Sequence, residues 1–439
     1  MKPTRKQIWT IAYPILISLL MENMIGLTDT AFLGRVGEVE LGASALGSVY
    51  YLVIFMLGFG FGIGAQILIA RRNGEKAYAL IGPLFQQGLL FLLSLATVMF
   101  VISHTFTPMV LRSLISSDEV YEAAVSYTNW RVFGFFFAFV AIMFRAFFVG
   151  ITNTKTLTLN VMVLSNVVLN YVLVFGKLGL PAMGIAGAAI ASSASEMISM
   201  VFFIVYTRLR IDHRKYGLFR FAGFSSKLLR GMLNVSVWTM IQMFVAISTW
   251  FFFFIAVEHL GERPLAVTNI IRSVSGIVFV IVSSFASTAS TLVSNQMGAG
   301  QPELVAGTTR RIVGMCYLIV IPLLALFAVF PELILRIYTD EQSLIDGSVA
   351  SLRVMLSSYL ISVPAFIRFN VVSGTGNTRS ALMLELATLS VYAIYTVWIV
   401  LYRHSDVALC WTTEHVYALV LLLLASLYLK KARWQDRKI

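Results

Sequence analysis

Two acidic residues interrupt an apolar run near the start of the chain. Glu22 and Asp29 lie within a stretch from about residue 8 to residue 34 that contains no lysine or arginine. Their spacing is about two helical turns, so both carboxylates share one helix face, about 10 Å apart along the axis. A carboxylate held away from water takes up a proton, because desolvation disfavours its charged form, or joins other oxygen ligands around a hard cation such as sodium.

A third acid, Glu196, lies in the middle of a later apolar run. Each of these acids also has a structural interpretation, in which nearby hydroxyls and amides satisfy it and lock two helices together. The depth of Asp29, and the presence of Glu22 on the same face, favour function there. Two acids of the second half, Glu385 and Glu414, lie close to the ends of their apolar runs, where facing lipid headgroups is favoured over a functional role.

Membrane-spanning helices must position these acids. Hydrophobic residues make up 58% of the chain and charged residues 12%, against about 25% charged in soluble domains, and the mean hydropathy is +0.84. Apolar runs of about 20 residues or more recur, each long enough to cross a ~30 Å hydrocarbon core as a helix, whereas a barrel would show short alternating segments. We predict an all-α polytopic membrane protein with twelve spans, at about 8–34, 42–70, 80–106, 121–150, 156–177, 182–207, 230–257, 264–293, 308–331, 347–373, 380–402 and 408–429.

Positive residues indicate the orientation of these spans. Lysines and arginines are concentrated in the two terminal segments, which include Lys2 and Lys438, and in the loop from Arg208 to Arg230. The predicted spans place all three segments on one side of the membrane. The opposite face holds only Arg35, Arg112, Lys177, Arg263, Arg336 and Arg403. We therefore expect both termini in the cytoplasm, and topology explains the net charge of +12 without nucleic acid. The basic loop is either a plain linker or a contact for anionic membrane lipid.

The two halves of the chain are repeats. Three pairs of matching positions share an offset of 224 residues: Gly37 with Gly261, Gly74 with Gly298, and Asn153 with Asn377. An even number of spans per repeat gives both copies the same orientation, related by a pseudo-twofold axis along the membrane normal. We predict a six-helix lobe over 1–210, a cytoplasmic linker over 211–229 and a second six-helix lobe over 230–439. This geometry favours an alternating-access carrier over a channel or a structural subunit.

Motifs for an enzyme are missing from the sequence. The five histidines are dispersed, and Cys316 and Cys410 lie 94 residues apart without a Cys-x-x-Cys pair. No Gly-x-Ser-x-Gly elbow and no phosphate-binding loop with Lys-Ser or Lys-Thr is present. We therefore expect no catalytic residues, no cofactor and no transition-metal centre, and an ion gradient as the energy source.

Several motifs resemble the multidrug and toxic compound extrusion (MATE) family: "LTDTAFLGRVGEVELGASALG", "GAQILIARRNGE" and "FRAFFVGITNTKT", with the doubled six-span layout and the basic central loop. The resemblance implies a monomer in a bacterial inner membrane that exports organic cations or other amphipathic compounds in exchange for protons or sodium. The predicted seventh span carries no carboxylate, so the chain resembles the DinF-type subgroup, which relies on acids of the first lobe.

The same resemblance implies a cation-coupling site at Asp29 with Asn166, Asn170 and Ser192, beside Glu22 and Glu196. Family members with a well-defined cation site can carry an aspartate where this chain has Asn170, and the loss of that charge favours protons over sodium. Sodium held by Asp29, Asn166 and Asn170 remains the alternative. By helical rise Asp29 is about 35 Å above Lys6 and Asn170 about 22 Å above Lys155, so direct contact requires the first helix to tilt or to project into the cytosol.

Candidate residues for a substrate cleft are Arg145, Phe136, Trp238 and Trp250. Aromatic rings stack on flat cations, although such rings also pack against helices or face lipid. Mid-span arginines either bind an anionic group, pair with the acids or extend to an interface. A cleft rich in arginine would instead fit a flippase for lipid-linked oligosaccharides, a related alternative. Alternate glycines from Gly58 to Gly64 are expected to serve helix packing.

Overall fold

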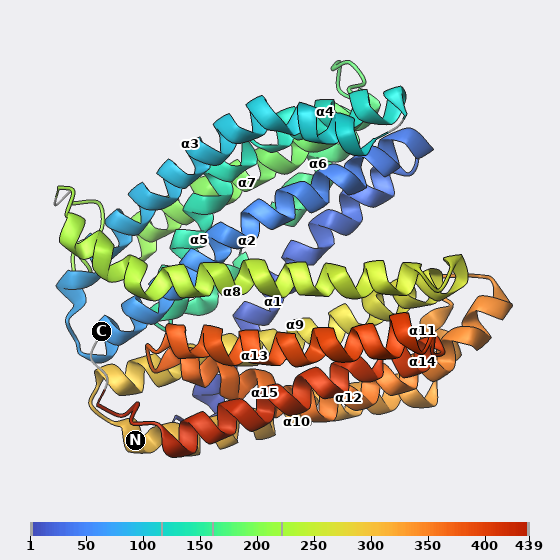
Figure 1. Cartoon of the computed structure of the whole chain (residues 1–439). Coiled ribbons are helices and arrows are strands. Elements are labelled where there is room, and N and C mark those ends of the chain that lie inside the picture. Colours follow the sequence, from blue (N-terminus) through green and yellow to red (C-terminus); the bar gives the residue numbers. More distant parts are fainter. Residues whose placement is uncertain (1–2, 116, 160–161, 221–222, 437–439) are drawn as a thin grey trace. The chain divides into compact units, whose positions relative to one another are not determined.

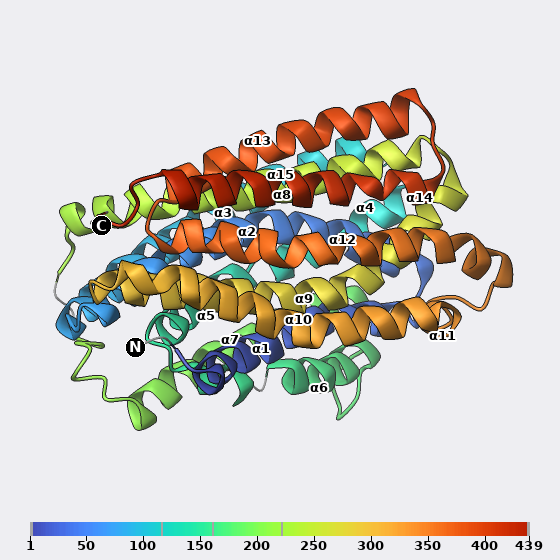
Figure 2. The ribbon, with the colours of Figure 1, turned by 90° about the horizontal axis from the view of Figure 1, so that it is seen from below.

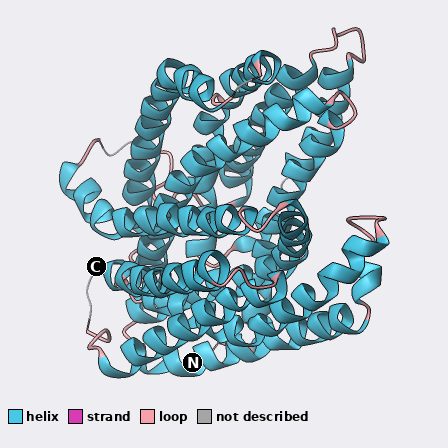
Figure 3. Ribbon diagram, turned by 45° about the vertical axis from the view of Figure 1, so that its right-hand side comes forward, coloured by secondary structure: helices cyan, strands magenta, loops and turns pink. Residues whose placement is uncertain are grey.

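The computed structural model describes residues 3–115, 117–159, 162–220 and 223–436, so that Lys2 and Lys438, both expected in the cytoplasm, lie outside the described residues. All regular secondary structure within these ranges is helical (Figure 3). Eleven helices of the described chain are long and apolar enough to cross a membrane, and a twelfth span results if the bent pair α4 and α5 is one span. The predicted all-α polytopic membrane fold is confirmed.

The long helices of the first half are α1 (Arg5–Leu33), α2 (Glu38–Gly74), α3 (Ile81–Leu114), α4 (Asp118–Arg131), α5 (Gly134–Gly150), α6 (Met162–Phe175) and α7 (Gly184–Arg210). Short 3-10 turns, η1 (Tyr78–Leu80) and η2 (Thr154–Leu159), lie before α3 and α6. The sequence predicted one span over 121–150, whereas α4 and α5 meet there at a bend of 45°.

The second half contains α8 (Ser226–Glu258), α9 (Glu262–Gly298), α10 (Val305–Val329), α11 (Pro331–Leu335), α12 (Gln342–Gly374), α13 (Thr378–Thr396), α14 (Val407–Cys410) and α15 (Thr412–Lys431). A 3-10 turn, η3 (Pro302–Leu304), precedes α10, and α13 continues into a π-helical turn, η4 (Val397–Tyr402). Between α7 and α8 the described residues 211–220 and 223–225 form no long helix, and the predicted lobe and linker boundaries remain a prediction.

The chain folds into two compact units. The first unit is Ile17–Met240, and the second unit combines Met1–Leu16 with Ile241–Ile439. The divisions after Leu16 and after Met240 are 224 residues apart, which is the offset of the repeat. The opening helix of each repeat, α1 or α8, therefore contributes its first part to the other unit.

Close helix packing in the first unit depends on the glycines of α2, which packs against α3, α4 and α5 (Figure 1). A Cβ atom on Gly58 would collide with the ring of Phe139 on α5. Two residues later, a Cβ atom on Gly60 would lie 2.7 Å from Met240 Cα on α8. Alternate glycines thus fit α2 between two neighbours, as expected for small residues at helix contacts in membranes.

In the second unit α12 is the central helix and packs against α9, α10, α13 and α15 (Figure 2). The largest buried apolar cluster of this unit is formed mainly by α9, α10 and α12. Ile8 and Ala12, from the first three turns of α1, are fully buried in the same cluster. The start of the chain is thus part of the second unit's core.

Candidate functional site

Asp29 lies at the centre of a buried polar cluster in the first unit. Its carboxylate accepts hydrogen bonds from Asn170 Nδ2 at 2.7 Å and Asn166 Nδ2 at 3.3 Å, both to Oδ1, and from Ser192 Oγ at 2.6 Å to Oδ2. Asp29 is 8% exposed and each of its three partners is at most 1% exposed. The contact between α1 and α6 that the helical rise placed in doubt is therefore made.

Local sequence explains how three helices converge on this carboxylate. Asn166 and Asn170 are four residues apart on α6, so both amides face the same side. Small residues at the start of α7 let it approach α6 closely: a Cβ atom on Gly187 would lie 2.7 Å from the carbonyl oxygen of Leu173. This close packing brings the Ser192 hydroxyl within reach of both Asp29 and Asn166.

Two amide oxygens of the cluster are left without partners. Asn166 Oδ1 and Asn170 Oδ1 are buried and accept no hydrogen bond within the described residues. Buried polar atoms of this kind are uncommon, and an unpaired one calls for an explanation such as a bound ion or water. The cluster therefore combines the Asp29 carboxylate with the side-chain oxygens of Asn166, Asn170 and Ser192. The carboxylate can bind a proton, and the four groups together supply the oxygen ligands that a small cation needs.

Glu196 belongs to a different arrangement, a buried ion pair with Arg131. The guanidinium of Arg131 donates from Nη2 to Oε1 at 2.7 Å and from Nη1 to Oε2 at 3.0 Å. The hydroxyl of Tyr51 donates to the same carboxylate at 2.9 Å, and its ring lies under the Arg131 guanidinium at 3.5 Å. This pair fixes α7 at the bend between α4 and α5.

Glu22 is also paired with an arginine. Arg145 of α5 donates through Nη1 to Glu22 Oε1, and Ser18, one turn earlier on α1, donates to the same oxygen at 3.4 Å. The side chain of Glu22 is 32% exposed and that of Arg145 is 12% exposed. Arginines therefore compensate the charges of Glu22 and Glu196, whereas Asp29 forms no ion pair within the described residues.

The other predicted cleft residues, Phe136, Trp238 and Trp250, are aromatic. Phe136 is half-buried on α5, with its ring 5.6 Å from that of Phe100. Trp238 is half-buried on α8 in the first unit, whereas Trp250 belongs to the second unit. There the guanidinium of Arg272 lies 5.6 Å from the Trp250 ring. The structure places these residues without showing a substrate on them, so their role in a cleft stays a prediction.

The sequence offered only part of these arrangements. Mid-span arginines suggested pairing with the acids, and Arg131 and Arg145 do pair in this way. Tyr51 was missed, because nothing in its local sequence distinguishes it from other aromatic residues of α2. Gly134, three residues after Arg131, is a sequence feature that could have indicated the ion pair. A Cβ atom at Gly134 would collide with Glu196 Oε2 and Arg131 Nη1, so a glycine leaves room for the pair.

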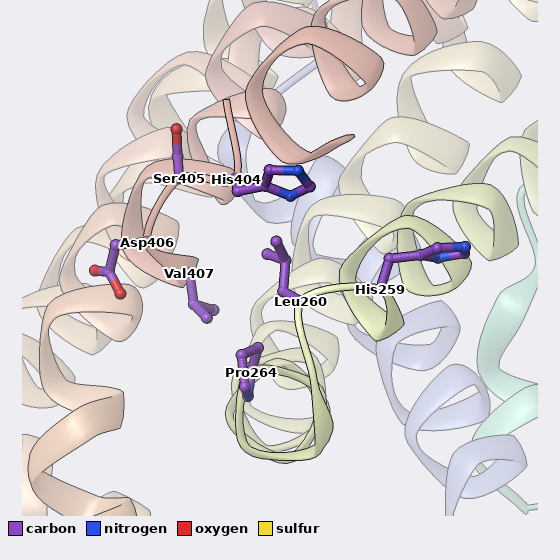
Figure 4. Close-up of a pocket in the computed structure, with 7 residues that line it drawn as sticks. All are labelled: His259, Leu260, Pro264, His404, Ser405, Asp406 and Val407. Carbon is purple, nitrogen blue, oxygen red and sulfur yellow. The ribbon is translucent and has the colours of Figure 1, made fainter. Parts of the chain in front are cut away.

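A pocket of about 360 Å³ lies in the second unit, lined by His259, Leu260, Pro264, His404, Ser405, Asp406 and Val407 (Figure 4). His259 and Asp406 are on opposite sides of it in this view. Within the described ranges, no three His, Cys, Asp or Glu side chains are close enough together to hold a metal ion.

Comparison with known proteins identifies the family. The model of the MatE family matches residues 14–176 and 239–399, which is most of the chain. The chain belongs to the MatE family. MatE proteins are transporters rather than enzymes, and the chain is a multi-pass membrane transporter, in agreement with the resemblance noted in the sequence. The DinF-type subgroup remains a prediction.

Individual MatE relatives are distant in sequence. The probable multidrug resistance protein NorM of Pasteurella multocida is 24% identical over 375 residues, covering 84% of this chain and 78% of the relative. The probable multidrug resistance protein YoeA of Bacillus subtilis is 25% identical over 406 residues, covering 90% and 86%.

Solved structures share the MatE fold. A crystal structure of MATE in the bent conformation has a TM-score of 0.87 at 18% identity, covering 97% of this chain and 95% of that one. A transporter of the MOP superfamily from Pyrococcus furiosus, described as having a binding pocket of reverse polarity that suggests a different function, has a TM-score of 0.86 at 19% identity and covers 97% of both chains. These likenesses show the fold alone.

Proposed function

We propose that this MatE transporter exports organic cations or other amphipathic drugs in exchange for protons, by alternating access of its two lobes, with Asp29 as the coupling group. It acts as a monomer in the bacterial inner membrane, with both termini in the cytoplasm. The names of its relatives support the substrate class, because two of them are called probable multidrug resistance proteins.

One observation carries the coupling proposal. Asp29 is buried and, within the described residues, accepts side-chain hydrogen bonds from neutral groups alone, whereas Glu22 and Glu196 each face an arginine. Protonation of a paired glutamate would leave a buried arginine charge uncompensated, which is costly. Protonation of Asp29 removes a buried charge instead and breaks no ion pair. Of the three acids, Asp29 is therefore the one best placed to gain and lose a proton.

Sodium remains the alternative coupling ion. The unpartnered oxygens of Asn166 and Asn170 favour it, because a hard cation needs several oxygen ligands. In the present arrangement, however, both amides turn their N–H groups toward Asp29, as they would toward a carboxylate that holds no cation. This orientation supports protons over sodium.

The flippase alternative depends on free arginines in a cleft. In the first unit Arg131 and Arg145 are both bound to carboxylates, which cancels their charge toward an anionic lipid headgroup. This pairing supports drug export over movement of a pyrophosphate-linked oligosaccharide.

Transport in proteoliposomes tests the proposal. Accumulation of a fluorescent organic cation such as ethidium is measured under an imposed pH gradient and, separately, under a sodium gradient. We expect the pH gradient to drive transport by the wild type and by the control Asp340→Asn, whose carboxylate is exposed, but not by Asp29→Asn. Transport by Asp29→Asn at the wild-type rate would refute the coupling role, and a response to sodium alone would replace protons by sodium.

A further inference from the structure

One buried and one half-buried carboxylate of the second unit, those of Glu385 and Glu414, have no role in the function proposed above. Glu385 lies two turns into α13 and is 2% exposed, and Glu414 lies in the first turn of α15. The expectation that Glu385 faces lipid headgroups is therefore wrong: α13 packs against α15 and α12, and this packing encloses the side chain.

The hydrogen bonds of this pair come from tyrosines. Tyr417 donates its hydroxyl to Glu385 Oε1 at 2.8 Å. The second oxygen, Glu385 Oε2, is buried and has no partner within the described chain. Tyr392 donates to Glu414 Oε1 at 3.4 Å. Within the described residues each carboxylate thus accepts a hydrogen bond from one tyrosine hydroxyl, and Glu385 Oε2 has no donor.

The two tyrosines connect the carboxylates. Their rings meet edge to face, with centroids 5.9 Å apart and an interplanar angle of 85°. Tyr417 lies within electrostatic range of both Glu385 and Glu414. The four side chains therefore form one polar group, which we call the carboxylate–tyrosine group, between α13 and α15.

Positive charge does not compensate this group. Neither Glu385 nor Glu414 forms an ion pair with any residue that the structure describes. Among the neighbouring titratable and charged side chains, Tyr359 of α12 is within electrostatic range of Glu414 and donates its hydroxyl to a backbone carbonyl. His415 of α15 contacts a serine hydroxyl, and Arg368 of α12 donates to another serine, Ser426.

The lack of a counter-ion among the described residues favours the protonated form of these carboxyl groups. An ionised carboxylate with one neutral donor is costly in an apolar interior, whereas the protonated form carries no charge and converts the unsatisfied oxygen into a hydroxyl. The repeat offset matches Glu385 with Val161 and Glu414 with Ile190 in sequence, so these acids are not copies of first-half acids. They are an independent feature of the second half.

We propose that the carboxylate–tyrosine group is a second proton-binding site, at which Glu385 and Glu414 exchange protons with water during the transport cycle. Each step is a simple transfer, in which a carboxylate oxygen gains a proton from water and later returns it. Proton binding here does not depend on Asp29, but its coupling to drug movement rests on the function proposed above.

Infrared spectroscopy tests proton binding without a transport assay. The carbonyl stretch of buried, protonated carboxyl groups is followed in the purified full-length protein while the pH is raised from about 5 to about 9. The measurement is made in the Asp29→Asn background, so that residue 29 contributes no signal. We expect Glu385→Gln and Glu414→Gln each to remove part of the pH-dependent band, and Tyr417→Phe to shift it without removing it. Glu332→Gln is the matched control, because Glu332 is exposed in the same unit.

Several results would overturn the proposal. A band that neither substitution changes would show that these residues hold no proton, and a band that persists at every pH would show that the proton does not exchange. A signal that responds to sodium at constant pH would make the group a cation site. Because no drug transport is measured, these outcomes are independent of the result for Asp29.

Coupling is then measured in proteoliposomes with Asp29 intact. If one of the two glutamates carries a coupled proton, its glutamine variant should reach a limiting drug accumulation lower by about tenfold per pH unit of gradient, while Glu332→Gln matches the wild type. Equal limiting accumulation in all variants would remove the role in coupling even where the infrared result stands.

Discussion

Substitutions at Glu196 and Arg131 distinguish a structural role of this ion pair from a role in proton coupling. Glu196→Gln leaves the guanidinium of Arg131, whose side chain is 10% exposed, against a neutral amide and the Tyr51 ring. Loss of one partner from a buried ion pair costs about 3–5 kcal/mol, because the remaining charge is uncompensated. The double variant Arg131→Met with Glu196→Gln removes both charges, so we expect it to cost about 1 kcal/mol or less, well below the sum of the single substitutions.

Denaturant titration in mixed detergent micelles gives the free energies of unfolding for the wild type, both single variants and the double variant. The same proteins are reconstituted for ethidium transport under a pH gradient. We expect the double variant to fold and to retain pH-driven transport, because Asp29 and its three donors are unchanged. A folded double variant without pH-driven transport would refute the reasoning and assign coupling to Glu196. Similar stability of Glu196→Gln and the wild type would refute the structural role.

Three further predictions concern stability. Gly64→Ala should destabilise the protein by about 1–3 kcal/mol, because a Cβ atom there would collide with a serine of α8, whereas Gly26→Ala, which meets nothing within 4 Å, should not; denaturant titration checks both. Glu22→Gln should cost less than Glu196→Gln, about 1–3 kcal/mol in the same titration, since the one-third exposure of Glu22 lets water solvate Arg145. Burial raises the pKa of Tyr216, which lies in the loop before α8. The protonated Tyr216 side chain therefore stabilises the folded protein below about pH 10, and this contribution is lost as the pH rises through the higher pKa of the folded state. Tyr216→Phe should therefore flatten the alkaline fall of the thermal unfolding midpoint.

Composition and repeat spacing predicted the helices because both depend on properties of the chain alone. A run of apolar residues of sufficient length has few alternatives to a membrane helix. The bend between α4 and α5 was not predicted, because it is stabilised by a residue far away in sequence: Glu196 of α7 binds Arg131 at the end of α4. No local signal near Arg131 identifies that partner.

The sequence predicted some residues of the candidate site and missed the burial of others. Asn166 and Asn170 were placed on one face by their spacing, and family resemblance joined them to Asp29, as the structure does. The depth of Glu385 was misjudged, because distance along the chain from the end of a span gives height in the membrane but not which neighbouring helix covers the side chain. Lateral burial of that kind depends on tertiary packing, here between α13 and α15.

The division of α1 and α8 between the compact units has a consequence for expression of the protein as two polypeptides. A chain cut in the loop between α7 and α8 would give one fragment whose first sixteen residues lack the core around Phe285, and another whose segment up to Met240 lacks the glycine face of α2. Each fragment thus holds a piece that only the other can cover. Co-expressed halves should consequently purify together and restore transport, and neither alone should be stable.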